Sequence, residues 1–535
     1  MKEFYLKPKL FSALKGYTGA QCIKDIVAGL IVAVIALPLS IALAIASGVE
    51  PACGIYTAIA AGILVSLLGG SRVQIAGPTA AFATIVAGIV ATEGMDGLFL
   101  STVLAGILLI LMGVLKLGGL IKFIPFTITT GFTTGIAVTL LVGQIKDFLG
   151  LTYADGVKPI ETVEKLEANI AAIGTFSWQA LLVGIVCLAI LMIYPRFEKR
   201  VPPSLLAVVV GALMVRFIPG MDEGVYTIGD LYTIPMGLPK VDLSGIELSL
   251  ARIGELLPNA VTIAVLAAIE SLLSCVVADN MIHSRHNPNA ELVGQGVANI
   301  GSVLFGGIPA TGAIARTAAN VKNGGRTPIA GIVHGVVLLL VLLFLMPYAG
   351  LIPMPAIAAI LFVVAYNMSE WRKMKRILQT APKSDIAVAV VTCVLTVVFD
   401  LVVAIAVGLV LALVLFLKRM SDKTQLTAMN APAGVQVWEV NGPLFFGSAD
   451  KIDAIAIEDG TAHVILCMHG VTALDSTAMN ALESLHHRCE AAGGDLLCVQ
   501  VNEQPLKVMK KAGFIQHLGE EHFLPSLEDA LEAVR

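Results

Sequence analysis

The chain has 535 residues, of which 57% are hydrophobic and only 14% are charged, and its mean hydropathy is +0.86. This hydrophobic fraction is well above that of soluble globular proteins, so the composition excludes that class. It predicts a multi-span α-helical membrane protein. The net charge of −4 excludes little, because the charges lie in loops and in the C-terminal part. The eight cysteines form no CxxC pair and no metal-ligand spacing, so we predict structural thiols and no metal site.

Fourteen apolar runs follow a polar, basic N-terminal segment, residues 1–24, which has no signal-peptide pattern. Seven runs lie within residues 25–218 and seven within 258–419, with a polar stretch, 219–257, between the two sets. The runs are 26–46, 52–68, 78–90, 99–115, 124–149, 180–194, 205–218, 260–278, 290–305, 311–321, 329–346, 352–364, 386–398 and 401–417. Several are shorter than the ~20 residues of a standard span. Because seven is odd, the second set must be inverted relative to the first.

Lysine and arginine are distributed unevenly among the turns between these runs. If the N-terminus is cytoplasmic, the cytoplasmic turns carry most of these cations, for example at 372–376, whereas the outer turns 91–97 and 346–350 carry none. The long outer loops, 152–178 and 219–257, hold a few cations mixed with acids. The positive-inside rule therefore predicts that both termini are cytoplasmic.

Two of the short runs, 78–90 and 311–321, follow Gly/Pro-rich interruptions and lie at matching places in the two sets. Residues 311–321 form a helix-compatible piece of small residues with Arg316 near its middle. In the first half Gly77, Pro78 and Thr79 open a similar run, and we expect Pro78 at the first helical position. A helix that begins at membrane depth points unpaired N–H groups and a positive dipole end at whatever lies before it. Paired interrupted segments with a buried arginine are typical of a transporter site and predict a pocket for an anion.

Glu270 is the only acidic residue in the apolar run 260–278. A carboxylate at membrane depth should be protonated or paired. One interpretation is a binding site for a co-transported cation, and the other is a structural ion pair with Arg316 that has no coupling role.

The composition changes after residue 423, where charge rises and the apolar runs shorten. This change predicts a soluble α/β domain over residues 420–535, which is long enough to fold alone. We expect strands at 435–440, 464–468 and 496–501, and helices at 476–492 and 504–512.

Several stretches resemble the sulfate permease (SulP) family, whose relatives include the animal solute-carrier anion exchangers and prestin. The resemblance rests on DIVAGLIVAVIALPLSIALA (25–44), GGSRVQIAGPTAA (69–81), IPATGAIARTAANVKNGGRTPIAG (308–331) and FDLVVAIAVGLVLAL (399–413). GVTALDSTAMNAL (470–482) resembles a STAS domain, and ATGAIAR is most similar to the bacterial subgroup that includes C4-dicarboxylate carriers. The resemblance implies two inverted seven-segment repeats, a core domain that moves against a gate domain in elevator fashion, and a C-terminal STAS domain.

By position, the resemblance also implies an anion cage drawn from three segments. Its residues are Pro38 and Ser40 in the first, Ala76, Gly77 and Thr79 in the third, and Thr311, Ala313, Ala315 and Arg316 in the tenth. Glu270 then belongs to the cation-coupling site. Ala315 occupies the position where the animal exchangers commonly have serine, so one side-chain hydroxyl is missing here. The substrate of this chain therefore cannot be inferred directly from theirs.

Each of these residues also has a simpler interpretation. Pro38 could only kink a spanning helix, Gly77 and Pro78 could form an ordinary turn, and Arg316 could snorkel to the interface. In bacterial anti-sigma antagonists that resemble the C-terminal domain, the serine at the position of Ser476 is phosphorylated, and phosphate at a helix N-terminus is favourable. A serine that merely caps the helix explains the same pattern.

We therefore predict a secondary active transporter of small oxyanions in a bacterial cytoplasmic membrane, coupled to H⁺ or Na⁺. Sulfate, bicarbonate and C4-dicarboxylate all remain candidates, as do symport and exchange. The sequence contains no Walker motif and no nucleophile–base set, so we expect neither an enzyme nor a cofactor. The alternatives are an uncoupled anion channel or voltage-responsive motor, an anion exchanger regulated by the STAS domain, and a membrane enzyme or sensor that uses the spans as an anchor. The resemblance implies a homodimer in the lipid bilayer, with no nucleic-acid partner and a cytoplasmic partner for the STAS domain.

Overall fold

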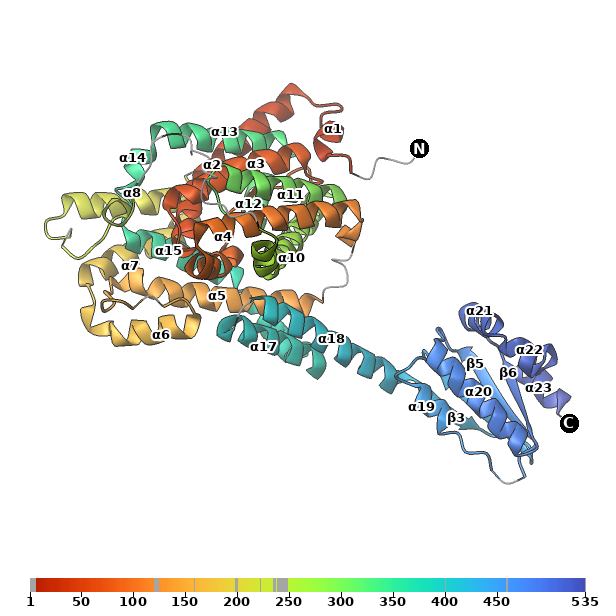
Figure 1. Ribbon diagram of the computed structural model, residues 1–535. Helices are drawn as coiled ribbons and strands as arrows, with labels where there is room; N and C mark the ends of the chain where they lie inside the picture. The colour runs from red at the N-terminus through yellow and green to blue at the C-terminus, as the bar shows by residue number, and fades with distance from the viewer. Residues whose placement is uncertain are drawn as a thin grey trace. The chain divides into compact units, whose positions relative to one another are not determined.

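The computed structural model describes residues 6–119, 125–157, 159–197, 201–221, 223–233, 237, 249–399, 401–458 and 460–534. The chain divides into two compact units, Met1–Leu409 and Val410–Arg535, and the boundary falls inside the last long helix (Figure 1). Each unit is described by itself below.

The first unit is helical apart from two very short strands. Its helices are α1 (Lys9–Ala13), α2 (Gly19–Ala46), α3 (Pro51–Leu68), α4 (Ala80–Val114), α5 (Phe126–Leu149), α6 (Thr162–Ala171), α7 (Trp178–Ile193), α8 (Pro203–Phe217), α9 (Ile228–Leu231), α10 (Leu250–Ile282), α11 (Pro288–Leu304), α12 (Ile314–Lys322), α13 (Ile329–Phe344), α14 (Met346–Ala349), α15 (Met354–Met368), α16 (Trp371–Thr380), α17 (Lys383–Val398) and α18 (Leu401–Lys423). The strands are β1 (Ala76–Gly77) and β2 (Thr311–Gly312), and 3₁₀ turns lie at Ile173–Thr175 and Tyr194–Arg196.

Each of the fourteen predicted apolar runs overlaps one of these helices, with one change in connection. The third and fourth runs lie in α4, which is broken at Gly94, where φ is 73° and ψ is −175°. Only glycine adopts this backbone conformation without strain, so the residue turns the chain between two helical pieces. Among the described residues, eight helices are long and apolar enough to cross a membrane, and α8 and α13 are apolar but shorter.

The helices of the first unit pack in two groups (Figure 1). In one group α4 packs against α10 and α11, α3 against α11, and α13 against α2 and α3. In the other, α5 packs against α15 and α17, and α7 packs against α8 and α15. Small residues let the helices of the first group approach closely, since a Cβ on Gly106 of α4 would lie only 2.7 Å from the Gly296 carbonyl oxygen of α11. Each group combines segments from both halves of the sequence.

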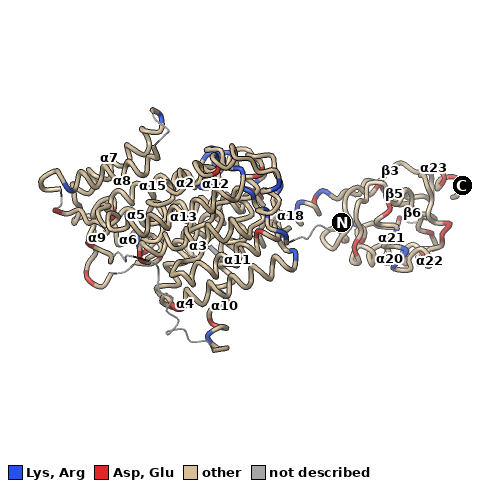
Figure 2. Tube along the Cα trace, turned by 90° about the horizontal axis from the view of Figure 1, so that it is seen from above, with Lys and Arg blue, Asp and Glu red and all other residues tan. Residues whose placement is uncertain are grey.

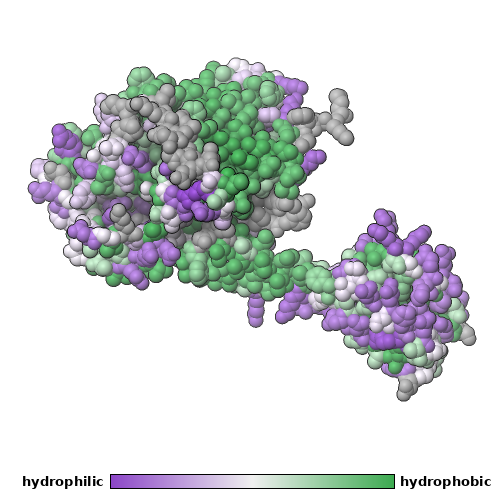
Figure 3. Space-filling model, in the orientation of Figure 1, coloured by the Kyte–Doolittle hydropathy of each residue, from purple (hydrophilic) through white to green (hydrophobic). Residues whose placement is uncertain are grey.

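The surface of the first unit suits a bilayer. Large apolar side chains lie exposed along its helices, among them Leu111, Leu340 and Val394, and Figure 3 shows wide hydrophobic areas on the visible face. Lysines, arginines and acids are sparse along the helices and gather near their ends and turns (Figure 2). This pattern follows from the high cost of charge in hydrocarbon.

The second unit holds a five-stranded sheet in the order β3-β4-β5-β6-β7. Its strands are β3 (Gln425–Met429), β4 (Val435–Asn441), β5 (His463–Gly470), β6 (Asp495–Val499) and β7 (Phe523–Leu524), and all neighbours are parallel except β3 and β4. Its other helices are α19 (Ala449–Asp453), α20 (Ser476–Ala491), α21 (Glu503–Ala512), α22 (Phe514–Leu518) and α23 (Leu527–Ala533), with a 3₁₀ turn at Glu520–His522. One apolar core joins the sheet to α19–α22 and a smaller one joins it to α23, so helices cover both faces.

The structure corrects three expected boundaries. The stretch 219–257, predicted as a loop and only partly described, contains the beginning of α10, which starts at Leu250 rather than near 258. The predicted outer loop 152–178 contains α6. The basic turn at 372–376 is part of the helix α16, in which four of the ten residues are lysine or arginine and the apolar residues Trp371, Met374, Ile377 and Leu378 recur at helical spacing.

Candidate functional site

The starts of the two short segments meet through a pair of two-residue strands. β1 and β2 are antiparallel, with Ala76 opposite Gly312 and Gly77 opposite Thr311, and all four residues are buried. Residues some 235 positions apart are therefore in direct backbone contact, which is the head-to-head meeting that the resemblance implies. Each strand runs straight into a helix, β1 into α4 and β2 into α12.

The two helices begin a few residues later than the sequence predicted. α4 starts at Ala80 with Thr79 as N-cap, so Pro78 precedes the helix instead of opening it. α12 starts at Ile314 with Ala313 as N-cap, so Thr311 lies in β2 and Arg316 is the third helical residue rather than a central one. These differences arise because residues 76–77 and 311–312 satisfy their backbone groups across the strand pair.

Neither helix start is capped by its N-cap side chain. Ala313 has no polar atom, and the hydroxyl of Thr79 makes no capping hydrogen bond. The Phe82 N–H of α4 donates to the Thr79 carbonyl at 3.2 Å. The first N–H groups before it, and those at the start of α12, keep their capacity for an acceptor, and the positive ends of both dipoles point into the junction. Thr79 is half-buried and Ala315 is exposed, so a small ligand can approach this side of the junction.

Arg316 reaches from α12 across to the other segment. Its side chain is only 1% exposed, and its Nη2 donates a hydrogen bond to the Pro78 carbonyl oxygen. The Nε and Nη1 atoms are buried and have no hydrogen-bond partner among the described residues. Gly77 makes room for the guanidinium, since a Cβ at that position would lie 3.2 Å from its Cζ and still closer to Nη1. The snorkelling interpretation of Arg316 is therefore wrong, because its charged group is buried against β1.

Glu270 lies on α10 beside the same junction and is 9% exposed. It accepts a hydrogen bond of 2.8 Å from the Thr79 hydroxyl to its Oε2. No direct ion pair joins it to Arg316 among the described contacts, although the two charges are close enough to interact through space. Glu270 thus accepts a hydrogen bond from one neutral hydroxyl and interacts with Arg316 only through space. It does not form the direct ion pair with Arg316 that the second interpretation of Glu270 requires.

The remaining predicted cage residues surround this centre less directly. Thr311 exchanges a hydrogen bond of 2.7 Å with Ser271 of α10 through their hydroxyls, so its side chain is directed to α10. Ala313 donates its N–H to the Ile75 carbonyl at 2.9 Å. Pro38 and Ser40 are buried within α2, and the Ser40 hydroxyl has no partner in the described part of the chain. Among the described contacts none connects these two α2 residues directly to Arg316.

Three polar residues support the junction although the sequence analysis did not select them. The Ser271 hydroxyl accepts from the Gly312 N–H at 3.1 Å, and Gln74 donates to the Ser271 carbonyl at 3.1 Å. Glu291 of α11 is completely buried. Its Oε2 accepts from the Gly70 and Ser71 amides at 2.8 and 3.1 Å, and its Oε1 accepts from the side-chain amides of Gln74 and Gln295 at 3.0 Å each. A lone acid in the apolar run 290–305 was the available signal for Glu291.

His334 is another buried polar residue that the sequence analysis missed. It lies on α13, is completely buried, and neither ring nitrogen has a partner among the described residues. Its Cδ2 lies 3.3 Å from where a Cβ of Gly62 would be, so α3 and α13 pack closely around the ring. A single histidine within an otherwise apolar run was the signal.

Ser476 begins α20 in the second unit, and the helix is capped by its neighbour. The Asp475 side chain accepts from the Ala478 N–H at 2.9 Å, so Asp475 is the N-cap and Ser476 is the first helical residue. The interpretation of Ser476 as a cap is therefore wrong. Its side chain is exposed at the helix N-terminus, where a phosphate would be accessible and favourable.

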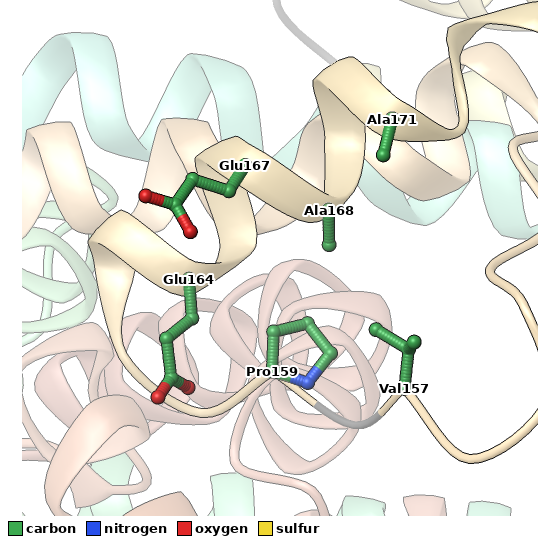
Figure 4. A pocket seen from close by; sticks show the side chains of 6 residues that line it. All are labelled: Val157, Pro159, Glu164, Glu167, Ala168 and Ala171. Atoms are coloured by element: carbon green, nitrogen blue, oxygen red, sulfur yellow. The ribbon is translucent and has the colours of Figure 1, made fainter.

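Surface cavities also lie away from the junction. Figure 4 shows one of about 440 Å³ beside α6, lined by Val157, Pro159, Glu164, Glu167, Ala168 and Ala171. Glu164 there accepts from the Ile160 and Glu161 amides, which lowers the pKa of its carboxyl. These bonds complete a capping box for α6, so this carboxylate stabilises a helix end. No three His, Cys, Asp or Glu side chains in the described ranges are arranged to hold a metal ion.

Comparison with known proteins agrees with the fold. A profile described as "Sulfate permease family" matches residues 22–393, and one described as "STAS domain" matches residues 428–530. The chain belongs to the sulfate permease family. This confirms the resemblance found in the sequence, and it makes the protein a multi-pass membrane member of a family of anion transporters.

Curated relatives of the sulfate permease family cover nearly the whole chain. The putative sulfate transporter YvdB of Bacillus subtilis is 41% identical over 95% of this chain and 97% of its own length. The bicarbonate transporter BicA of Synechocystis is 30% identical over 95% of this chain and 93% of its own length. These relatives are named for two different anions.

Solved structures share the fold. A structure of the murine Slc26a9 anion transporter in the inward-facing state has a TM-score of 0.87 at 18% identity and covers 98% of this chain and 93% of its own. The transmembrane domain of a cyanobacterial bicarbonate transporter, BicA, has a TM-score of 0.60 at 28% identity over 74% of this chain and 98% of its own. The predicted architecture of inverted repeats followed by a STAS domain is confirmed.

Proposed function

We propose that this protein is a secondary active transporter that carries a small oxyanion across the membrane together with H⁺ or Na⁺. The observation that carries the proposal is the β1–β2 junction, where two uncapped helix N-termini and the buried Arg316 meet beside Glu270. Backbone N–H groups and helix dipoles attract an anion without adding a second fixed cation. The names of the relatives support sulfate and bicarbonate as candidate substrates, and the ATGAIAR segment adds C4-dicarboxylate.

In this proposal the anion binds between the starts of α4 and α12. The first-turn amides of both helices replace part of its hydration shell, and Arg316 with the two dipoles balances its charge. A proton or sodium ion binds at Glu270, where the carboxylate has one hydrogen-bond donor among the described residues and keeps capacity to accept more. The loaded site then carries little net charge, so the core group of α2–α4 and α10–α13 can move against the gate group of α5, α7, α8, α15 and α17.

The first experiment is uptake of labelled sulfate, bicarbonate and succinate into proteoliposomes, each under an inward H⁺ or Na⁺ gradient. We expect saturable uptake of at least one of the three, increased by one of the two gradients. Uptake that no gradient increases, accompanied by net anion current, would instead support the alternative of an uncoupled channel. Failure of all three anions in active, sealed vesicles would contradict the proposed substrate class.

Variants at the two charged residues separate binding from coupling. Arg316→Ala removes the buried cation, and we expect uptake to fall by about 10- to 100-fold, the range for hydrogen bonds to charged groups. Glu270→Gln keeps the shape of the side chain but removes its charge, so gradient-driven uptake should be lost while anion exchange partly remains. Arg216→Gln, at an exposed position in the last turn of α8, is the matched control. Gradient-driven uptake that persists in Glu270→Gln would disprove the coupling role.

The orientation and assembly are also part of the proposal. The cytoplasmic placement of both termini is supported by the lysine and arginine pattern of the turns. Accessibility of single introduced cysteines to an impermeant reagent in intact cells tests it. The family resemblance supports a homodimer, and cross-linking in membranes tests that assignment.

A further inference from the structure

Helix α16 occupies a defined place relative to the bilayer. It connects α15 and α17, two apolar helices that both pack against α5, through turns of only two residues on either side. A ten-residue helix between two such segments must lie at the membrane surface rather than cross the core. Its ~15 Å length then runs along the headgroup region.

The composition of α16 matches this place. It contains Arg372, Lys373, Lys375 and Arg376 and no acidic residue, and all four cations are exposed. Ile377 is buried against the protein, whereas Trp371 and Leu378 are 43% and 48% exposed. Exposed basic side chains beside an aromatic and an aliphatic residue form the pattern of helices that lie in the interface of anionic membranes.

The cations of α16 are largely unpaired. Lys373 pairs with Glu370 at 2.5 Å, but none of Arg372, Lys375 and Arg376 forms an ion pair in the described part of the chain. Arg372 lies over the Trp371 ring, 5.3 Å from its centroid, which keeps both side chains at the surface.

A cavity lies where α15 turns into α16. It has a volume of about 290 Å³ and is lined by Tyr366, Asn367, Glu370, Trp371, Arg372 and Lys373. Tyr366 and Trp371 are exposed aromatic residues at its rim, a residue type that is enriched at the level of lipid headgroups. Glu370 pairs with Lys373 at this cavity, so the lining combines the positive charge of Arg372 with an aromatic edge.

We propose that α16 and the α15–α16 turn form a binding site for the headgroup of an anionic phospholipid. Arg372 and Arg376 bind the phosphodiester, the cavity at Tyr366 and Trp371 holds the glycerol region, and Leu378 contacts the acyl chains. The site is separate from the anion junction and does not depend on the transported substrate. By binding lipid on the helix that joins α15 to α17, it stabilises the gate group.

The test measures lipid retention and heat stability of the full chain, with any affinity tag removed, in a neutral detergent. Phosphatidylglycerol should be retained in native mass spectra at several times the level of phosphatidylcholine, and it should raise the midpoint of thermal unfolding more. Its retention should fall as salt rises, because the contact is electrostatic. Inorganic phosphate and glycerol 3-phosphate should not displace it, since the acyl chains contribute to binding.

A matched pair of variants localises the effect. Arg372→Gln with Arg376→Gln should abolish the preference for phosphatidylglycerol but leave the midpoint without added lipid unchanged. Lys510→Gln with Lys511→Gln removes the same charge from α21 in the second unit and should leave the preference intact. Equal retention of both lipids by the wild type, or a preference that survives in the α16 variant, would overturn the proposal. So would displacement by soluble phosphate, which would identify a simple phosphate site. If the α16 double variant does not fold, two other measurements decide the case. They are the salt dependence and lipid preference of the wild type, compared with those of Trp371→Ala.

Discussion

Two buried carboxylates on neighbouring helices have very different surroundings. Glu291 on α11 accepts four hydrogen bonds, two from backbone amides and two from side-chain amides. Glu270 on α10, beside the helix starts, accepts one, from Thr79, among the described contacts. Both lie in apolar runs, so sequence composition alone does not separate them.

The difference shows how this fold uses buried charge. A carboxylate with all its lone pairs occupied is a structural anchor, and Glu291 fixes the turn at residues 70–71 that leads into β1. A carboxylate with a single donor keeps acceptor capacity for a cation. Fully satisfied polar groups stabilise a buried site, whereas partly satisfied ones are candidates for ligand binding. The following tests address this contrast, from the largest expected effect to the smallest.

Glu291→Gln should have the largest effect, on folding. The glutamine would place an NH₂ group where one carboxylate oxygen now accepts two hydrogen bonds. The two buried N–H donors on that side would lose their acceptor, which should lower the free energy of unfolding by about 2 kcal/mol or more. Thermal unfolding in detergent and the monodisperse yield measure the loss. Glu167→Gln, at an exposed site on α6, is the control. If Glu270→Gln destabilises the protein as much as Glu291→Gln does, the proposed contrast is wrong.

Gly77→Ala should mainly affect the anion site. The new Cβ would overlap the Arg316 guanidinium, so the arginine must move away from the Pro78 carbonyl. We expect uptake to fall by about tenfold or more, which corresponds to ~1.4 kcal/mol, with little change in yield. Gly143→Ala on α5 is the control, because a Cβ there meets no atom within 4 Å. Normal uptake by Gly77→Ala would show that the position of Arg316 does not matter.

Thr79→Val should have a smaller effect that is confined to coupling. It removes the only donor to Glu270 among the described residues, and a neutral hydrogen bond contributes about 1 kcal/mol, or roughly fivefold in an equilibrium constant. We expect the dependence of uptake on the driving ion to shift by about that factor. Thr92→Val, whose hydroxyl bonds only to its own helix, is the comparison. An unchanged ion dependence would mean that Thr79 does not support the cation site.

The smallest expected effect concerns a buried titratable group outside the membrane-spanning helices. Burial lowers the pKa of His486 in α20, with His487, His517 and His522 acting in the same direction and Glu490 opposing them. The unfolded chain therefore binds more protons than the folded one once the pH falls below about 6.5, so stability decreases in that direction.

Hydrogen exchange of β5 and α20 in the full chain, followed from pH 7.5 to 5, tests this expectation. Protection should decrease slightly toward acid, and His486→Gln should reduce the slope. Glu490, whose pKa is lowered by its hydrogen bond to His487, affects stability only near and below its ordinary value of 4.5. A slope that His486→Gln leaves unchanged would assign the effect to the other histidines.

The sequence by itself determined the class of the protein and where the proposed site should be sought. Apolar runs predicted the spanning helices, the paired short segments with Gly77 and Arg316 predicted two helix starts at membrane depth, and the shift after residue 423 predicted the α/β unit. These signals are local, because hydropathy and helix-start chemistry depend on neighbouring residues.

Only the tertiary structure decided which buried polar residues hold the site together. Three of the four donors to Glu291 belong to Gly70, Ser71 and Gln74, more than 200 positions away in the chain. Gln74 likewise donates to the carbonyl of the distant Ser271, and Gly77 pairs with Thr311 of β2. The strand pair also moved both helix starts, leaving Pro78 and Thr311 outside the helices. Local propensity does not encode such contacts, because a buried backbone or side-chain group takes whichever partner the fold brings near it.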